Sequence, residues 1–327
     1  MVNENRMVTS KQLSGTLVAL VTPFEEFSLK IKPEVNQAAF VKIIDYVAPH
    51  VGGIVLTAST GSHSYFINNA QSQIDTINFA ASYIRSRYPG KLIIAGDWSS
   101  DIWEAIERVK RIEGETGVNI HLSMSPGESK PSDESIFRHF YELADNTEGY
   151  FIPYSIPSRS GGKGILSRIV KRLAKHPRII GLKDCSGRTE EIARLTKRLD
   201  FAVLSGDDSS AVEDIRLGAR GLISTLGNLA PSKINEMISL SLQKKYEQAR
   251  KISENFAKSG IYLSLFPKLE NRNPANNPAT TQYAMNILGF DVGRTPTQLA
   301  ECSRAEKRGI RRSIYKLKIS NCLERRY

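Results

Sequence analysis

The sequence predicts a (β/α)8 barrel, a closed ring of parallel strands surrounded by helices. From Gly15 onward, short β-branched runs alternate with amphipathic helical stretches, and the alternation repeats eight times at intervals of roughly 25–35 residues. A doubly wound open sheet is the alternative. Such a sheet ordinarily has a glycine-rich turn after its first strand, whereas this chain has Val21-Thr22-Pro23-Phe24 there. The barrel is therefore the favoured fold.

The predicted strands are short runs rich in valine, isoleucine and leucine, and turn residues follow most of them. They are Gly15–Thr22, Gly53–Thr57, Lys91–Gly96, Val118–Ser123, Gly149–Tyr154, Ile179–Lys183, Ala202–Ser205 and Gly221–Ser224. The segments between and after them have helical periodicity, as the stripe of Ile102, Ile106, Val109 and Ile112 illustrates. These predicted helices are Pro33–Val47, Ala70–Arg87, Ser100–Glu115, Ser132–Asn146, Leu166–Lys175, Thr189–Leu199, Ser210–Leu217 and Pro231–Leu242.

Beyond Lys244 the pattern changes to helical segments without strands. Tyr246–Leu265 and Thr280–Leu288 are predicted helical, and the Pro/Asn-rich stretch Phe266–Pro278 is a loop between them. We therefore divide the chain into a barrel with a short N-terminal arm, residues 1–244, and a C-terminal helical extension with a basic tail, residues 245–327.

Composition indicates a soluble, cytoplasmic protein. The chain has 327 residues, of which 40% are hydrophobic and 24% charged, values ordinary for a globular protein. No apolar run approaches the roughly 20 residues that a membrane-spanning helix needs, and the N-terminus lacks the apolar core of a signal peptide. The three cysteines and five histidines show no metal-ligand spacing, so we expect no metal.

The formal net charge of +11 is concentrated at the C-terminus. Residues 303–327 contain nine Lys/Arg and two Glu, a net of +7, which leaves +4 for the rest of the chain. Ile310, Ile314 and Leu317 share one helical face there, which favours a basic amphipathic helix packed on the body. Contact with RNA or an anionic surface is the alternative. Because the excess is local, the charge does not predict a nucleic-acid-binding protein.

Lys183 is the residue most indicative of chemistry. It ends the run Ile179-Ile180-Gly181-Leu182-Lys183, and Ser186-Gly187 forms a turn shortly after it. A buried amine at a strand end loses its proton more easily through desolvation, and can then attack a carbonyl carbon. For a single lysine, a side chain that reaches out to solvent is the simpler interpretation.

Two other sequence features fall at the same end of the predicted barrel. Tyr154 ends the fifth strand, and Ser59-Thr60-Gly61 follows the second as a turn whose N–H groups suit a carboxylate. Alone, each is also compatible with a core tyrosine or an ordinary turn. The carboxyl ends of barrel strands converge on one face, where catalysis takes place. Because Tyr154 and the Ser59-Thr60-Gly61 turn lie at the same end of the barrel as Lys183, the three together predict an active site.

These segments together resemble the dihydrodipicolinate synthase / N-acetylneuraminate lyase family of Schiff-base-forming (β/α)8 enzymes. The resemblance runs from about Leu13 to Arg294-Thr295-Pro296 and covers most of the chain. The matching stretches are Gly15-Thr16-Leu17-Val18-Ala19-Leu20-Val21-Thr22-Pro23-Phe24, Ser59-Thr60-Gly61, Tyr154-Ser155-Ile156-Pro157-Ser158-Arg159-Ser160-Gly161, the Lys183 strand and Leu204-Ser205-Gly206-Asp207-Asp208.

The resemblance implies a role for each matching residue. Lys183 corresponds to the lysine that condenses with pyruvate or another 2-oxo acid, so the covalent imine takes the place of a cofactor. Tyr154 corresponds to the tyrosine that moves protons, with Ser59 in the same relay. The resemblance also assigns a substrate-binding set, in which Ser59 and Thr60 bind the carboxylate of the 2-oxo acid. This set comprises Ser59, Thr60, Gly61, Arg159 and Ile223.

Arg159 indicates which branch of the family the chain resembles. Pro157-Ser158-Arg159-Ser160-Gly161 is similar to the synthase branch, in which this arginine binds the carboxylate of the aldehyde substrate. A guanidinium fork suits two-point binding of a carboxylate. A surface arginine after a proline turn is the alternative.

Three departures from the family pattern indicate an altered pocket for the second substrate. The loop after the fourth strand has Gly127-Glu128 where the family has a Tyr-Tyr pair, and His63 stands close after the Ser-Thr-Gly turn. Trp98 lies in the usually small turn after the third strand. The pocket wall is therefore expected to differ while the lysine, the tyrosine and the carboxylate turn are kept.

We therefore predict a Schiff-base lyase or aldolase that acts on a 2-oxo acid and an aldehyde bearing a carboxylate, nearest the dihydrodipicolinate synthase branch. A retro-aldolase or dehydratase of a 2-oxo-3-deoxy sugar acid is one alternative. A catalytically idle barrel with a binding role is another. The family is commonly tetrameric, so we expect a homo-oligomer, a tetramer or a dimer, with no membrane or nucleic-acid partner.

Overall fold

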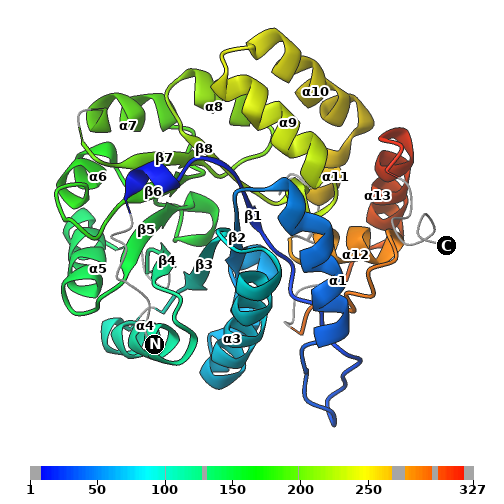
Figure 1. Ribbon diagram of the computed structural model, residues 1–327, viewed down its shortest axis with the longest axis horizontal. Coiled ribbons are helices and arrows are strands. Elements are labelled where there is room, and N and C mark those ends of the chain that lie inside the picture. The colour runs from blue at the N-terminus through cyan, green and yellow to red at the C-terminus, as the bar shows by residue number, and fades with distance from the viewer. Residues whose placement is uncertain are drawn as a thin grey trace.

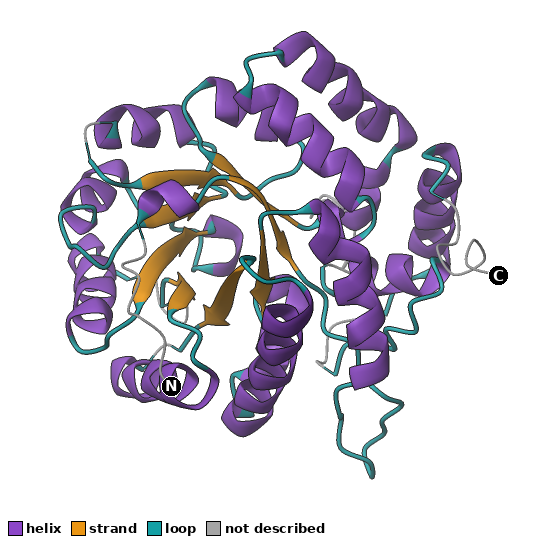
Figure 2. Ribbon diagram, viewed as in Figure 1, coloured by secondary structure: helices purple, strands orange, loops and turns teal. Residues whose placement is uncertain are grey.

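The computed structural model describes residues 9–319 except 100, 127–130, 198, 267–276 and 297–300. Eight parallel strands close into a barrel in chain order, with β1 paired to β8, and helices surround it (Figures 1 and 2). The predicted (β/α)8 barrel is thus confirmed. The strands are β1 (Gly15–Ala19), β2 (Gly53–Leu56), β3 (Leu92–Asp97), β4 (Ile120–Met124), β5 (Tyr150–Ser155), β6 (Gly181–Asp184), β7 (Ala202–Ser205) and β8 (Gly221–Ser224).

The helices of the outer layer follow the strands that they connect. They are α1 (Gln37–Val47), α2 (His63–Phe66), α3 (Ala70–Arg87), α4 (Ile102–Thr116), α5 (Asp133–Asp145), α6 (Ser167–Leu173), α7 (Thr189–Thr196), α8 (Ala211–Arg216) and α9 (Pro231–Leu242). Short 3-10 turns are η1 (Ser10–Gln12), η2 (Ala48–His50), η3 (Ser59–Gly61), η4 (Pro157–Arg159) and η5 (Leu226–Asn228). The short helix α2 was not predicted.

Strand alternation divides the apolar side chains into an inner and an outer core. Leu17, Val55, Ile94, Leu122 and Ile223 belong to a cluster of buried side chains that fills the barrel. Their strand neighbours point outward, where two further clusters join the strands to the helices. The barrel is therefore packed with side chains, as expected for eight parallel strands, and chemistry is confined to its ends.

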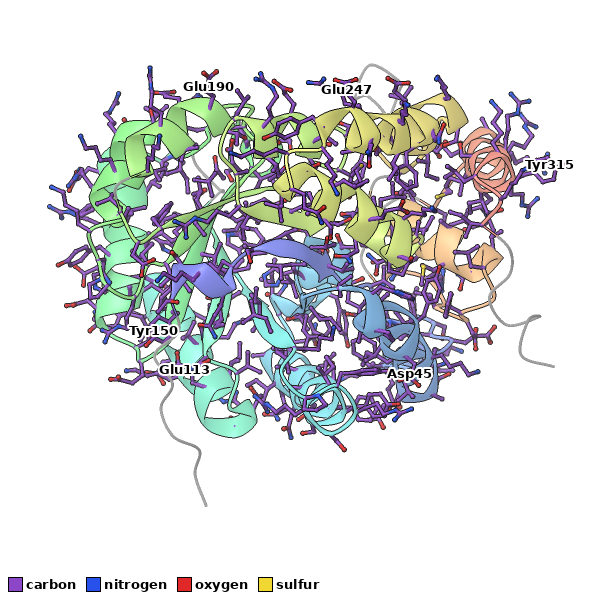
Figure 3. The ribbon with its side chains drawn as sticks, turned by 45° about the horizontal axis from the view of Figure 1, so that its top comes forward. Asp45, Glu113, Tyr150, Glu190, Glu247 and Tyr315 are labelled. Carbon is purple, nitrogen blue, oxygen red and sulfur yellow. The ribbon has the colours of Figure 1, made fainter. Side chains whose placement is uncertain are left out.

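The C-terminal extension packs on one side of the barrel. It comprises α10 (Tyr246–Ser259), α11 (Ile261–Leu265), α12 (Ala279–Ile287) and α13 (Arg304–Lys316). Helix α10 packs against α9, and α13 packs against α11 and α12, so that α13 lies at one edge of the molecule (Figure 1). Ile310 and Ile314 of α13 are buried, so the predicted packing of this basic helix on the body is confirmed. Its Tyr315 points to solvent and is 85% exposed (Figure 3).

Several predicted boundaries were wrong by a few residues, each for a local reason. Strand β1 ends at Ala19 rather than Thr22, and the N–H of Val21 donates to Oδ1 of Asn228 at 3.0 Å. Helix α1 begins at Gln37 because Asn36 caps it, accepting from the N–H of Ala39 at 2.8 Å. The segment Tyr246–Leu265 is two helices rather than one, since Gly260 between them has a φ of 85°.

Among the described helices, none is long and apolar enough to span a membrane. In the same part of the chain, no three His, Cys, Asp or Glu side chains lie close enough together to hold a metal ion.

Candidate active site

Lys183 lies inside the barrel, one residue before the end of β6. It pairs with Tyr154 of β5 on one side and with Leu204 of β7 on the other. The next residue, Asp184, fixes the turn: its Oδ1 accepts from the N–H of Ser186 at 3.0 Å and from its hydroxyl at 2.6 Å. Its Oδ2 accepts from the N–H of Arg188 at 3.2 Å. The chain is thus turned away from the barrel directly after the lysine, which leaves the amine facing the mouth.

The Lys183 side chain is only 5% exposed. Burial lowers the pKa of its amine, and the negative charges of Cys185 and Asp208, when present, oppose that shift. Space for the side chain depends on Gly206, because a Cβ at that position would lie 2.9 Å from Cε of Lys183. The amine is therefore held in a dry, fitted position, which favours its neutral, nucleophilic form.

Tyr154 contacts the lysine through its ring and the rest of the site through its hydroxyl. Nζ of Lys183 lies 4.2 Å from the ring centroid. The hydroxyl is hydrogen-bonded to Ser59 and accepts from Sγ of Cys185 at 3.7 Å. Burial raises the pKa of the phenol well above its usual value, while the positive charge of Arg159 and the bond to Ser59 act in the opposite direction. At neutral pH the phenol is protonated and can act as a proton donor.

The predicted carboxylate turn is the 3-10 turn η3 between β2 and α2. Its Thr60 is buried, and Oγ1 of Thr60 accepts from Nδ2 of Asn277 at 2.9 Å and lies 3.2 Å from Oγ1 of Thr225. The carbonyl of Gly61 accepts from the hydroxyl of Thr22 at 2.9 Å. The first N–H groups of such a turn have no partner within it. Contacts from the segments that follow β1 and β8, and from the segment that precedes α12, therefore hold a set of donors at the mouth of the barrel.

Arg159 lies in η4, directly after β5, and its side chain is exposed. Its Nη2 donates to the carbonyl of Asn277 at 2.8 Å. Its positive charge lowers the pKa of both Tyr154 and Lys183, although burial has the larger effect on each. The guanidinium therefore faces the same mouth as the lysine and the tyrosine.

The two described residues of the predicted altered wall, His63 and Trp98, lie together beside Tyr154 and Ser59. A cavity of about 10 Å³, room for one water molecule, is lined by Ser59, His63, Trp98, Leu122, Met124 and Tyr154 among others. Nδ1 of His63 lies 3.0 Å from the carbonyl of Thr57, and its Nε2 lies 3.3 Å from the carbonyl of Trp98. Burial lowers the pKa of His63 to about 4. Nε1 of Trp98 is buried and has no hydrogen-bond partner among the described residues.

Two members of the predicted set stand apart from this cluster. Ile223 is fully buried within β8 and belongs to the apolar filling of the barrel. Glu128 lies outside the described residues, so its place in the pocket wall stays a prediction.

Several residues that support the site were not predicted. Asp208 accepts from the N–H groups of Thr225 and Leu226, both at 3.0 Å, and from the hydroxyl of Ser224. It thereby fixes the turn that brings Thr225 to Thr60. Asn277 joins Thr60 to Arg159 through its side chain and its carbonyl. Asp208 belongs to the stretch Leu204-Ser205-Gly206-Asp207-Asp208, which matches the family but to which no role was assigned. Asn277 lies in the Pro/Asn-rich stretch that was predicted only to be a loop.

Comparison with known proteins identifies the family. The model of the dihydrodipicolinate synthetase family matches residues 12–315. The chain belongs to this family. Its relatives include the 4-hydroxy-tetrahydrodipicolinate synthase of Buchnera aphidicola subsp. Schizaphis graminum, which is 32% identical over 243 residues, covering 73% of this chain and 79% of that protein. The synthase of Sodalis glossinidius is 29% identical over 307 residues, covering 92% and 97% of the two chains.

Solved structures of the dihydrodipicolinate synthetase family share the fold. The chloride-inhibited dihydrodipicolinate synthase from Acinetobacter baumannii, complexed with pyruvate, superimposes with a TM-score of 0.82 at 26% identity, covering 94% of this chain and 99% of that one. The enzyme from Aquifex aeolicus gives 0.81 at 27% identity, covering 94% and 98%. The family comprises lyases that form a Schiff base between a lysine and pyruvate. The predicted family is thus confirmed.

Proposed function

We propose that this chain is a Schiff-base lyase or aldolase whose Lys183 condenses with pyruvate or another 2-oxo acid. The observation that carries the proposal is the buried Lys183 amine, with its lowered pKa, against the ring of Tyr154. The neutral amine attacks the ketone carbon, and loss of water gives an imine. Once protonated, the imine withdraws electrons, so the adjacent carbon loses a proton and becomes a nucleophilic enamine. Attack on an aldehyde forms the new carbon–carbon bond, and hydrolysis of the imine releases the lysine.

The other residues then have distinct roles. Tyr154 donates a proton to the departing hydroxyl, which leaves as water during imine formation, and Ser59, hydrogen-bonded to Tyr154, relays a proton from solvent back to the phenolate. The donors of η3, with Thr60, bind the carboxylate of the 2-oxo acid. Gly61 belongs to this turn, and the proposed role of Ile223, which is buried in the barrel, is to contribute apolar surface below the pocket. The covalent imine requires no further cofactor.

The second substrate is proposed to be an aldehyde with a carboxylate distant from its reacting carbonyl. Arg159 is exposed at the mouth and its charge reaches both Lys183 and Tyr154. This arrangement supports the proposal that the chain is nearest the dihydrodipicolinate synthase branch. The altered wall favours a second candidate, cleavage or dehydration of a 2-oxo-3-deoxy sugar acid. The buried Nε1 of Trp98, without a partner among the described residues, is a donor for a substrate hydroxyl.

We also propose that the protein is a cytoplasmic homo-oligomer, a tetramer or a dimer. Oligomers are usual in the family, although a monomeric dihydrodipicolinate synthase variant has the same fold, with a TM-score of 0.81. Light scattering coupled to size exclusion at micromolar protein concentration tests this point. A monomer at all concentrations would contradict it.

Product analysis tests the proposed reaction. The purified protein is incubated with pyruvate and aspartate semialdehyde, and separately with several 2-oxo-3-deoxy sugar acids, and products are identified by mass spectrometry. Because the pocket wall is altered, we expect slow condensation with aspartate semialdehyde and faster turnover of another carboxylate-bearing partner. Efficient condensation would show that the wall does not exclude the usual substrate. No turnover of any compound, together with no imine, would favour a binding role for an idle barrel.

A further inference from the structure

A second cavity lies between the C-terminal extension and the loop that follows β1. Its volume is about 240 Å³, enough for a small organic molecule. Its lining comes from α12, from α13 and its approach, and from the loop after β1. The residues that bear on its chemistry are Phe27, Gln282, Tyr283, Arg294, Cys302 and Lys307.

Two polar side chains that line this cavity each have a buried oxygen without a hydrogen-bond partner in the part of the chain that the structure describes. Gln282 is 1% exposed, and its Oε1 has no hydrogen-bond partner among the described residues. The hydroxyl of Tyr283 is likewise buried and unpaired within the described chain. Burying such a group unpaired costs about 1–3 kcal/mol. Adjacent unpaired groups that line one cavity are therefore expected where a ligand completes their hydrogen bonds.

The two ends of the cavity differ in the charge of the side chains around them. An outer groove of about 810 Å³ shares the lining residues Phe27, Asn286, Gly293, Arg294 and Glu301 with it. The groove also carries the carboxylates of Glu25, Glu26 and Asp291, so with Glu301 four acids face one arginine. At the inner end, Nζ of Lys307 lies 5.5 Å from the ring centroid of Tyr283. A cation is therefore favoured outside, and a neutral group inside.

We propose that this cavity binds a small ammonium compound whose other end is a hydroxyl or a carboxamide. The inner group donates to Oε1 of Gln282 and accepts from the hydroxyl of Tyr283, which satisfies both unpaired atoms. The ammonium group lies in the acidic outer groove. This binding site stands on its own geometry and does not depend on the reaction proposed above.

The site is connected to the carboxylate turn through one side chain. Nε2 of Gln282 donates to the carbonyl of Thr22 and to the hydroxyl of Ser62, both at 3.3 Å. Thr22 in turn bonds to Gly61, and Ser62 follows it. A ligand that holds the Gln282 amide therefore holds the turn as well. This consequence rests on the proposed function: occupancy lowers the pyruvate concentration needed for half-maximal imine formation.

Protection of Cys302 tests the site directly. This free thiol lines the cavity and is 7% exposed, so a bound molecule shields it. The full-length protein is treated with methyl methanethiosulfonate, with and without 3-amino-1-propanol, and modification is followed by peptide mass spectrometry. At a probe concentration about twice its Kd, we expect about 3-fold slower modification of Cys302, with Cys185 as the reference thiol. Propylamine and 1-propanol each lack one of the two groups and should not protect.

Two tyrosine variants separate ligand binding from structure. Tyr283→Phe removes an unpaired hydroxyl, so it should raise the melting temperature while abolishing protection. Tyr262→Phe is the matched control. Its hydroxyl lies 3.3 Å from Oγ of Ser253, so its loss should lower stability and leave protection unchanged. Equal protection by propylamine, protection retained in Tyr283→Phe, or no protection by the probe would overturn the site.

The effect of the bound ligand on imine formation can be disproved independently of the binding site itself. Protection of Cys302 together with an unchanged pyruvate requirement would leave the site standing and overturn the link. If Lys183 forms no imine at all, the proposed function fails, and the protection experiment still decides whether the cavity binds the probe.

Discussion

The amine of Lys183 lies over the face of the Tyr154 ring, with Nζ 4.2 Å from the ring centroid, rather than beside the tyrosine hydroxyl. An aromatic face stabilises a cation, whereas burial destabilises it, and the lowered pKa of Lys183 shows that burial has the larger effect. The hydroxyl instead contacts Ser59 and Cys185. In the proposed reaction, the Lys183 amine and the Tyr154 hydroxyl therefore act on the substrate from separate positions.

The buried amine should cost the protein stability, in a way that depends on pH. Because the pKa of Lys183 is lower in the folded than in the unfolded chain, the unfolded chain holds more protons between that value and the usual 10.5. Stability should therefore rise as pH increases through this window. We expect Lys183→Met to be more stable than the wild type at pH 7, with a smaller difference at pH 10. Urea denaturation at both pH values measures this. An equal difference at both would contradict the assigned pKa shift.

Removal of the Tyr154 hydroxyl should slow the chemistry and leave the fold intact. General acid–base losses are typically about 10²-fold or more, so we expect that reduction in imine formation and turnover for Tyr154→Phe. Tyr150→Phe is the matched control, since Tyr150 begins the same strand at the far end of the barrel (Figure 3). Stopped-flow kinetics provide the measurement. Wild-type turnover in Tyr154→Phe would mean that another group moves the protons, and Glu128 would be tested next.

Arg159 should govern the second substrate and not the first. A charge-assisted bond to a carboxylate contributes about 1.5–3 kcal/mol, which corresponds to about 10- to 100-fold in affinity. Arg159→Ala should raise KM for the carboxylate-bearing partner by that factor, with imine formation from pyruvate nearly unchanged. Arg168→Ala is the control, because Arg168 is an exposed arginine paired with Asp133 on the outer surface. Unchanged kinetics on every acid would remove the argument for a distal carboxylate.

His63 should make the protein sensitive to acid. Its pKa is lowered to about 4 by burial, so the unfolded chain binds a proton between pH 6.5 and pH 4 that the folded chain does not. The free energy of unfolding should therefore decrease as pH falls from 6.5 to 4. By pH 4.5, the protonation of His63 in the unfolded chain should have lowered it by roughly 2–3 kcal/mol. His63→Gln should lose stability less steeply than the wild type between pH 7 and pH 4.5. Parallel curves would show that His63 titrates normally. Burial also lowers the pKa of His139 to about 4, so His139 contributes separately to the loss of stability in acid.

The sequence predicted the barrel because its period and its strand chemistry are local properties. All eight strands were placed to within a few residues, and the rim positions of Lys183 and Tyr154 followed from strand order alone. The break at Gly260 was missed, although a glycine after an amphipathic helix is a common terminator.

The supporting contacts were less accessible to prediction because they join distant parts of the chain. Asn277 reaches Thr60 across 217 positions, and Gln282 reaches Thr22 across 260. No periodicity or spacing encodes such pairs. They arise only when the C-terminal extension packs on the barrel.

Covalent trapping tests the central claim most directly. The protein is incubated with pyruvate and sodium borohydride, which reduces an imine to a stable amine, and intact mass and peptide mapping locate the adduct. The account predicts a single reduced adduct on Lys183 in the wild type and in Arg159→Ala, and none in Lys183→Ala. Stoichiometric trapping of pyruvate by Lys183→Ala, or an adduct mapped to another lysine, would contradict it.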